Sequence, residues 1–148
     1  MSVQDNIRLV KSHYEAVNHN DFDAGAMLVD KNFEWTNVPM NLKKRGQNGY
    51  KEFLGLWFTA LPDAKVDIKN IQANEEWVIV EFSGKGTNSG PFNSPDGQIM
   101  PTGKHVELQF CELFQIKNGK IVKGKLYFDT ASLMKQLGIV PDLKSQNA

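Results

Sequence analysis

Hydrophobic side chains in the first sixty residues recur at steps of three and four, the spacing of one face of an α-helix. The first stripe predicts a helix from about 2 to 19, and its members are Val3, Ile7, Val10, Tyr14 and Val17. A shorter helix is expected to follow Asp21, because an Asp side chain can cap the first free N–H groups of a helix. A dense third stripe from about 46 to 61 predicts another helix, and Pro62 ends it.

The rest of the chain has the pattern of strands. Phe33–Asn37 alternates like a short strand, and residues 77–82 form a nearly continuous apolar run, typical of a strand inside a sheet. Beyond Lys104, two long strand-like runs flank Asn118-Gly119, a strong hairpin signal. Residues 84–103 are rich in Gly, Pro, Asn and Ser, which predicts a long loop. Whether that loop covers a pocket stays open.

A last helix is predicted from about 130 to 137, with Gly138 at its end, and a loose arm follows from Ile139. Helices first and strands later indicate an α+β fold in one domain, residues 1–148. We expect the N-terminal helices to pack across the open face of a curved antiparallel sheet. Such a sheet forms a cone whose mouth offers an apolar pocket lined by aromatic side chains.

Charge and composition narrow the choice of partners. The chain has 17 basic and 17 acidic residues and no net charge, which argues against nucleic acid or an anionic membrane as the main partner. No apolar run has the length of a signal peptide or a membrane span, so a cytoplasmic location is expected. The spacing of the three His residues matches no metal site, and Cys111 is expected to be a small buried apolar residue.

An acid stands where the last strand meets the last helix. Alternation places Asp129 on the same strand face as Lys123, Lys125 and Tyr127. If that face is solvated, Asp129 caps the helix that follows. If it turns inward, Asp129 is a carboxylate in a pocket, where desolvation would raise its pKa and suit it to proton transfer. The spacing alone favours the cap.

Several short motifs together resemble those of a known family. In chain order they are Leu61-Pro62-Asp63, Gly86-Thr87, Pro101-Thr102-Gly103, Asn118-Gly119-Lys120-Ile121, and Asp129 followed by Gln136-Leu137-Gly138. Their order and spacing resemble the SnoaL-like polyketide cyclases, or ester cyclases, of the nuclear transport factor 2-like superfamily. The resemblance covers nearly the whole chain and implies a cone-shaped, cystatin-like roll.

The resemblance also implies an apolar pocket for a hydrophobic small molecule, no metal, no organic cofactor and a homodimer. It implies that Asp129 acts as acid and base in an intramolecular aldol ring closure, and so favours a pocket position for that residue. The chain departs from the family where a His is common, because it has Asn37 and Asn88 there. Asn can hydrogen-bond a carbonyl group but cannot exchange a proton near pH 7.

The first hypothesis is therefore a small enzyme that acts on a hydrophobic carbonyl compound by aldol-type cyclisation or isomerisation, with Asp129 as general acid and base. The candidate polar partners in the pocket are Tyr127, Asn37, Asn88 and His105, and the candidate walls are Trp35, Phe53 and Trp57. The alternative is a non-catalytic module of the same fold that binds a small molecule or dimerises, since a fold does not fix a function.

Overall fold

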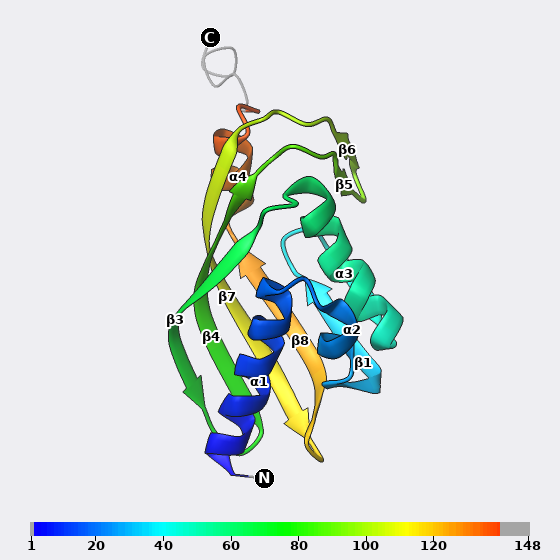
Figure 1. Cartoon of the computed structure of the whole chain (residues 1–148), viewed down its shortest axis with the longest axis vertical. Helices are drawn as coiled ribbons and strands as arrows, with labels where there is room; N and C mark the ends of the chain where they lie inside the picture. The colour runs from blue at the N-terminus through cyan, green and yellow to red at the C-terminus, as the bar shows by residue number, and fades with distance from the viewer. Residues whose placement is uncertain (1, 140–148) are drawn as a thin grey trace.

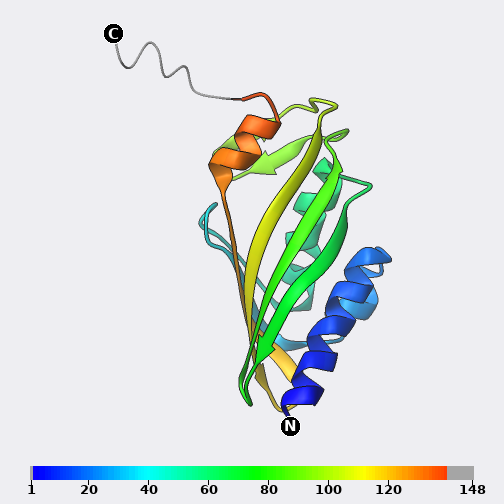
Figure 2. The same cartoon turned by 90° about the vertical axis from the view of Figure 1, so that its left-hand side faces the viewer.

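The computed structural model describes residues 2–139, so most of the predicted C-terminal arm, residues 140–148, lies outside the described part. Three helices, α1 (Val3–Asn18), α2 (Phe22–Ala26) and α3 (Gly46–Ala60), lie on one side of a curved sheet (Figures 1 and 2). The sheet has six strands in the order β2-β1-β8-β7-β4-β3. Their bounds are β1 Val29–Asn37, β2 Leu42–Arg45, β3 Lys65–Ala73, β4 Trp77–Thr87, β7 His105–Lys117 and β8 Lys120–Phe128.

This architecture confirms the predicted α+β fold, with one refinement in the sheet. Strand β1 runs parallel to β8, with Trp35 opposite Gly124 and Asn37 opposite Leu126, whereas the other neighbours in this sheet are antiparallel. The sheet is therefore mixed. Pairing between strands so far apart in the chain leaves no local sequence signal, and only the hairpin at Asn118-Gly119 has one.

The helix ends follow from local side-chain chemistry. The Ser2 hydroxyl accepts a hydrogen bond from the Asp5 backbone N–H, and the Asp5 carboxylate accepts one from Ser2, which together form a capping box at α1. The Asp21 carboxylate accepts from the Ala24 N–H and starts α2 as predicted. The apolar stripe of α1 faces the sheet, and its buried members are Val10, Tyr14 and Val17.

The predicted loop between β4 and β7 contains a short hairpin, β5 (Phe92–Ser94) with β6 (Gly97–Ile99). Its base is held by the buried Asn88, whose amide group donates to the carbonyl oxygens of Ala60 and Gly90. The Asn88 carbonyl oxygen accepts from the N–H and hydroxyl of Thr102, at 2.9 and 2.8 Å. This segment is thereby fixed against the end of α3.

The interior of the cone is filled by aromatic rings from helices and strands. Trp35 of β1 stacks on Phe53 of α3, with ring centroids 3.8 Å apart and planes 8° from parallel. A Cβ atom added at Gly124 of β8 would lie 2.8 Å from Trp35 and 3.0 Å from Phe114, so only glycine lets these rings rest on the strand. A second apolar cluster lies under α4 (Thr130–Gln136), at the end of the molecule opposite the N-terminus (Figure 1).

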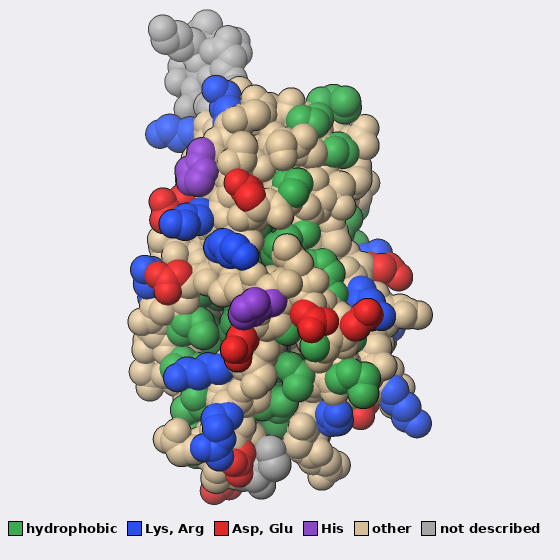
Figure 3. Space-filling model, in the orientation of Figure 1, with side chains coloured by type: hydrophobic (Ala, Val, Ile, Leu, Met, Phe, Trp, Pro, Cys, Tyr) green, Lys and Arg blue, Asp and Glu red, His purple; other side chains and the backbone are tan. Residues whose placement is uncertain are grey.

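The outer surface agrees with the balanced charge of the sequence. On the face drawn in Figure 3, basic and acidic side chains are mixed, with small apolar areas between them. Within residues 2–139, no helix is long and apolar enough to cross a membrane.

Candidate functional site

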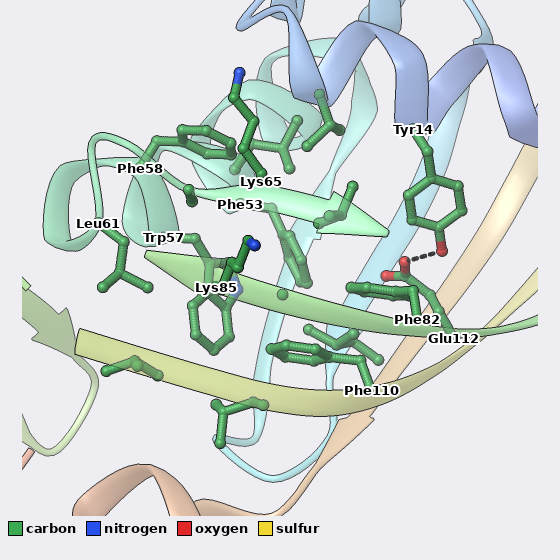
Figure 4. Close-up of a pocket in the computed structure, with 18 of the residues that line it drawn as sticks. Tyr14, Phe53, Trp57, Phe58, Leu61, Lys65, Phe82, Lys85, Phe110 and Glu112 are labelled. Atoms are coloured by element: carbon green, nitrogen blue, oxygen red, sulfur yellow. Dashed lines mark hydrogen bonds between the residues drawn. The ribbon is translucent and has the colours of Figure 1, made fainter. Parts of the chain in front are cut away.

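A cavity lies inside the cone, between helices α1 and α3 and strands β3, β4, β7 and β8 (Figure 4). Its volume is about 80 Å³. At ~10–15 Å³ for each enclosed water, this is room for roughly six waters, or a compact ligand with a similar number of non-hydrogen atoms. Its walls are mainly aromatic and aliphatic, and the rings that face it include Tyr14, Phe53, Trp57, Phe58, Phe82 and Phe110.

One carboxyl group reaches this apolar cavity. Glu112 lies in the middle of β7, where alternate residues such as Leu108 and Phe114 are buried against the helices. Only 2% of Glu112 is exposed to solvent. The Tyr14 hydroxyl donates a hydrogen bond to its Oε1 at 2.7 Å, and the Trp35 indole N–H donates one to its Oε2 at 2.8 Å.

This environment changes the proton affinity of Glu112. Burial raises the pKa of its carboxyl from 4.5 to about 7, although the hydrogen bonds from Tyr14 and Trp35 act in the opposite direction. Desolvation is the larger effect because the charged form loses its water, whereas two donors restore only part of that solvation. A carboxyl with a pKa near neutrality can both accept and release a proton at physiological pH.

A second polar pair borders the same cavity. His13 of α1 lines it next to Tyr14, and the His13 Nδ1 atom lies 2.8 Å from the Tyr50 hydroxyl oxygen of α3. His13 is 1% exposed, and burial lowers its pKa to about 3, so its imidazole is neutral at physiological pH. Burial also raises the pKa of the Tyr50 hydroxyl, which therefore keeps its proton. The pocket thus combines an ionisable acid with a neutral imidazole.

Charged groups also occur among the lining residues of β3 and β4. Lys65 and Lys85 are exposed and face each other in the register of these strands (Figure 4). The Lys65 ammonium group donates to the Asn18 carbonyl oxygen at the end of α1. The residues that line the cavity therefore include the buried acid Glu112 and the two exposed basic residues Lys65 and Lys85.

Asp129 lies outside this cavity. It is exposed and is the N-cap of α4, where its carboxylate accepts hydrogen bonds from the Ala131 N–H at 2.9 Å and the Ser132 hydroxyl at 2.8 Å. These hydrogen bonds, chiefly that from Ser132, hold its pKa below the ordinary value. The expectation of a pocket carboxylate with a raised pKa is therefore wrong for Asp129, and the helix-cap alternative describes its position. The physical reason is that odd-numbered residues at the end of β8, such as Lys125 and Tyr127, point to solvent.

The other candidate residues divide between pocket, core and surface. Phe53 and Trp57 line the cavity, whereas Trp35 lies behind Phe53 and contributes through its bond to Glu112. Asn37 is buried and accepts from the Met40 N–H at 3.2 Å, so it stabilises the turn after β1.

Asn88 is used by the loop contacts described above. His105 and Tyr127 are exposed and are not among the residues that line the cavity. The structure thus brings only two of these seven predicted substrate contacts directly to the cavity.

The residues that sequence reasoning missed are Glu112, Tyr14 and His13 as polar groups of the pocket. One signal pointed to Glu112, because it occupies the same face of its strand as the apolar residues Leu108 and Phe114. An ionisable residue on an otherwise apolar strand face is expected to be buried with partners. His13 is buried, and the Tyr50 hydroxyl is the partner of its Nδ1 atom.

No group of three or more His, Cys, Asp and Glu side chains within residues 2–139 is arranged to hold a metal ion.

Comparison with known proteins places this fold in a recognised class. A protein of ketosteroid isomerase-like fold from Catenulispora acidiphila DSM 44928, in complex with trimethylamine, superposes with a TM-score of 0.74 at 14% identity, over 90% of this chain and 93% of that one. The cone with helices across its mouth is thus the ketosteroid isomerase-like, or nuclear transport factor 2-like, fold.

Within that class, the chain belongs to the SnoaL-like polyketide cyclase family, whose sequence profile matches residues 7–137. A SnoaL-like polyketide cyclase candidate from Jannaschia sp. CCS1 has a TM-score of 0.82 at 18% identity, over 94% of this chain and 95% of that one. The protein TerC, co-crystallised with polyporic acid, has a TM-score of 0.71 at 18% identity, over 90% and 98%. No curated protein matches the sequence.

Proposed function

We propose that the protein is a small enzyme that binds a compact, hydrophobic carbonyl compound in the cone and transfers a proton through Glu112. The observation that carries this proposal is a buried carboxyl with a pKa of about 7 that borders an apolar cavity. An acid of this pKa is matched to general acid–base work at neutral pH. Membership of the SnoaL-like family supports the same class of chemistry.

The proposed reaction begins with proton removal next to the carbonyl group. The Glu112 carboxylate takes the proton from the α-carbon, and the electron pair of the broken C–H bond moves toward the carbonyl oxygen to form an enolate. Return of the proton to another carbon is an isomerisation. In an aldol ring closure, the enolate carbon instead bonds to a second carbonyl carbon of the same molecule, and the new alkoxide takes the proton from Glu112. Both reactions use the same carboxyl as base and then as acid.

Small-molecule binding by relatives agrees with this proposal. The Catenulispora protein was solved with trimethylamine and TerC with polyporic acid. At 14% and 18% identity these structures support the fold of the pocket, and the ligand of this chain is inferred from its own residues.

Proton exchange with solvent tests the proposal with a simple ketone in place of the natural substrate. We expect the wild-type protein, incubated in D₂O with small ketones such as cyclohexanone, to catalyse deuterium incorporation at the α-carbon, measured by NMR. Glu112→Gln should abolish this exchange. The variant is nearly isosteric, because its amide oxygen can accept from Trp35 while its NH₂ group donates to the Tyr14 oxygen.

Asp129→Asn is the matched control, since it also replaces an acid by its amide but at the cap of α4. It should leave exchange unchanged. Exchange that persists in Glu112→Gln, or that disappears in Asp129→Asn, would show that Glu112 is not the base.

A second candidate function is non-catalytic binding of the same kind of molecule. It is favoured by the fact that both carboxylate oxygens of Glu112 already accept a hydrogen bond. A satisfied buried acid can serve to orient a ligand or to fix the core. In that case a bound ketone would be recovered without deuterium, although NMR would detect its contact with the aromatic walls.

We also propose that the outer face of the sheet mediates a homodimer. Ile79 and Leu113 are directly opposite each other on β4 and β7, and Cys111 is opposite Tyr127 on β7 and β8. Ile79 is 41% and Tyr127 40% exposed. Sedimentation of the wild type as a dimer, and of Ile79→Glu as a folded monomer, is the expected result, whereas a monomeric wild type would refute the interface.

A further inference from the structure

We propose that His13 is a second functional group of the pocket, whose Nε2–H donates a hydrogen bond to the carbonyl oxygen of the ligand, and that Tyr50 is a positioning residue that fixes this tautomer. The inference rests on the proposed function, because it concerns the carbonyl compound on which Glu112 acts. It assigns the group that would stabilise negative charge on oxygen while Glu112 removes the proton from carbon.

The position of His13 fits this role. It precedes Tyr14, the donor to Glu112, on helix α1, and both residues line the cavity. Four rings surround the imidazole, with centroid distances of 4.7 Å to Tyr14, 5.4 Å to Trp35, 5.5 Å to Tyr50 and 5.2 Å to Phe114. Packing of this kind holds the ring in one orientation, as a preorganised donor requires.

The hydrogen bond to Tyr50 determines which nitrogen carries the proton. In the part of the chain that the structure describes, the hydroxyl of Tyr50 has a single hydrogen-bond partner, the His13 Nδ1 atom at 2.8 Å. Tyr50 is 1% exposed, and a buried hydroxyl proton needs an acceptor. Tyr50 must therefore donate to Nδ1, which leaves the imidazole proton on Nε2.

Close packing keeps the Tyr50 hydroxyl in this place. A Cβ atom added at Gly25 of α2 would lie 2.0 Å from the hydroxyl oxygen. Glycine at residue 25 thus leaves the space that the Tyr50 hydroxyl occupies. Helix α2, which packs against this hydroxyl, prevents the Tyr50 ring from moving away from His13. Helices α1, α2 and α3 thus together hold the hydrogen bond that determines the tautomer of His13.

The Nε2 atom is the part of His13 that remains for a ligand. Among residues 2–139, the only hydrogen bond of the His13 side chain is the one at Nδ1. An N–H that makes no hydrogen bond to the protein can donate to a ligand oxygen in the cavity. Because burial keeps the imidazole neutral, the group can donate a hydrogen bond without giving up a proton.

Glu112 and His13 have separate roles in the proposed enolisation. Glu112 accepts the proton from the α-carbon, the C–H electron pair forms the C=C bond, and the carbonyl π electrons move to oxygen, where the His13 Nε2–H stabilises them. The proton then returns from Glu112, so His13 begins and ends the cycle neutral. The ligand class is therefore a carbonyl compound, rather than an alkene or alkane of the same shape.

A nuclear magnetic resonance experiment on the wild-type protein tests the tautomer and the contact directly. Long-range ¹H–¹⁵N correlations should show the His13 proton on Nε2. Cyclohexanone should move the Nε2–H signal downfield, whereas methylenecyclohexane, which has CH₂ in place of oxygen, should not. His19 is the internal control, because it lies at the end of the same helix and is exposed. A proton on Nδ1, or equal shifts with both ligands, would overturn the proposal.

Variants then test the function. His13→Phe should lower kcat for ketone exchange by ~10²–10³-fold, the usual effect of losing one such donor, with a smaller change in KM. Tyr50→Phe should make part of the His13 population carry its proton on Nδ1 and lower kcat less. His13→Gln, which retains a donor, should keep part of the rate, and His19→Gln should keep all of it.

The outcomes separate this inference from the proposed function. If exchange requires Glu112 but His13→Phe retains the wild-type kcat, the role of His13 is refuted and the role of Glu112 stands. If Glu112→Gln exchanges as fast as the wild type, the proposed base is refuted, and the ketone-specific shift of the wild-type Nε2–H still decides whether His13 contacts the carbonyl oxygen. Because that shift needs no variant, a His13→Phe protein that does not fold leaves the test intact.

Discussion

Replacement of Glu112 by Gln should remove one pH-dependent contribution to the free energy of unfolding, the contribution that the wild type loses as the pH rises. The pKa of the Glu112 carboxyl rises from 4.5 to about 7 on folding because the group is buried in the apolar interior. At ~1.36 kcal/mol for each pKa unit, this difference corresponds to roughly 3 kcal/mol of folding free energy. The Gln variant carries no titrating group at this position and lacks the effect.

The sign follows from where the proton binds more tightly. The folded pKa is above the unfolded pKa, so the folded protein binds this proton better than the unfolded chain does. The stability that protonated Glu112 contributes is fully present below pH 4.5 and is lost as the pH rises through about 7. The wild type should therefore lose stability relative to Glu112→Gln between these pH values.

A direct scan of the wild type would hide this effect, because His13 acts in the opposite direction. Burial lowers the pKa of His13 from 6.5 to about 3, so the unfolded chain binds that proton better and stability falls as the pH drops below 6.5. The cap residue Asp129, whose pKa is lowered, also loses its contribution in acid. Both groups are present in the variant, so the difference between the two proteins isolates Glu112.

Urea unfolding at a series of values from about pH 4 to about pH 8 gives the required free energies. The stability of the wild type minus that of Glu112→Gln should decrease by roughly 3 kcal/mol across this range. Glu107→Gln is the matched control, because Glu107 is an exposed residue of the same strand, and its difference from wild type should stay flat. A flat difference for Glu112→Gln as well would mean that Glu112 has an ordinary pKa, and would remove the basis of the proposed base.

Three further substitutions test other parts of the structure. Asp129→Ala should lower the free energy of unfolding in thermal or urea denaturation, since it removes the cap of α4, and should not alter ketone exchange; unchanged stability would contradict the cap. Trp35→Phe should raise the pKa of Glu112 above its wild-type value, because the indole donor stabilises the carboxylate, and an unchanged pKa by ¹³C NMR titration would show that the bond is unimportant. Gly124→Ala should cost ~1–3 kcal/mol, since the new methyl group would press on the rings of Trp35 and Phe114; a variant as stable as wild type would show that these rings move freely.

Sequence patterns were sufficient for the elements whose causes are local. The first helix was predictable from its apolar stripe, α2 from the cap at Asp21, and the β7–β8 hairpin from Asn118-Gly119, and all three are present. Strand β2 and the β5–β6 hairpin were not predicted, since strands of four and three residues carry too little periodicity. The parallel pairing of β1 with β8 depends on packing across the whole chain.

The site was harder to predict than the fold, because it depends on which face of each strand points inward. A shift of one position exchanges the inner and outer faces of a strand. The sequence correctly predicted an acid at the junction of the last strand and the last helix. Asp129 nevertheless lies outside the cavity, because it follows the exposed residues Lys125 and Tyr127. Glu112 was overlooked although it shares a strand face with the apolar residues Leu108 and Phe114, and the helices cover that face of β7.

The position of these two acids limits what chemistry the pocket can perform. Strands β7 and β8 pair so that Glu112 is opposite Leu126, and both side chains line the cavity, whereas Asp129 lies beyond the end of β8 and is bound to the first turn of α4. Among the described residues that line the cavity, Glu112 is the only acid, and the one imidazole, His13, is kept neutral by burial. Glu112 is therefore the group that we propose removes a proton from an enclosed ligand. If that group does not exchange protons with a bound ketone, the aromatic walls and the His13 donor describe a binding site, and the choice between enzyme and binding protein reduces to the behaviour of one carboxyl.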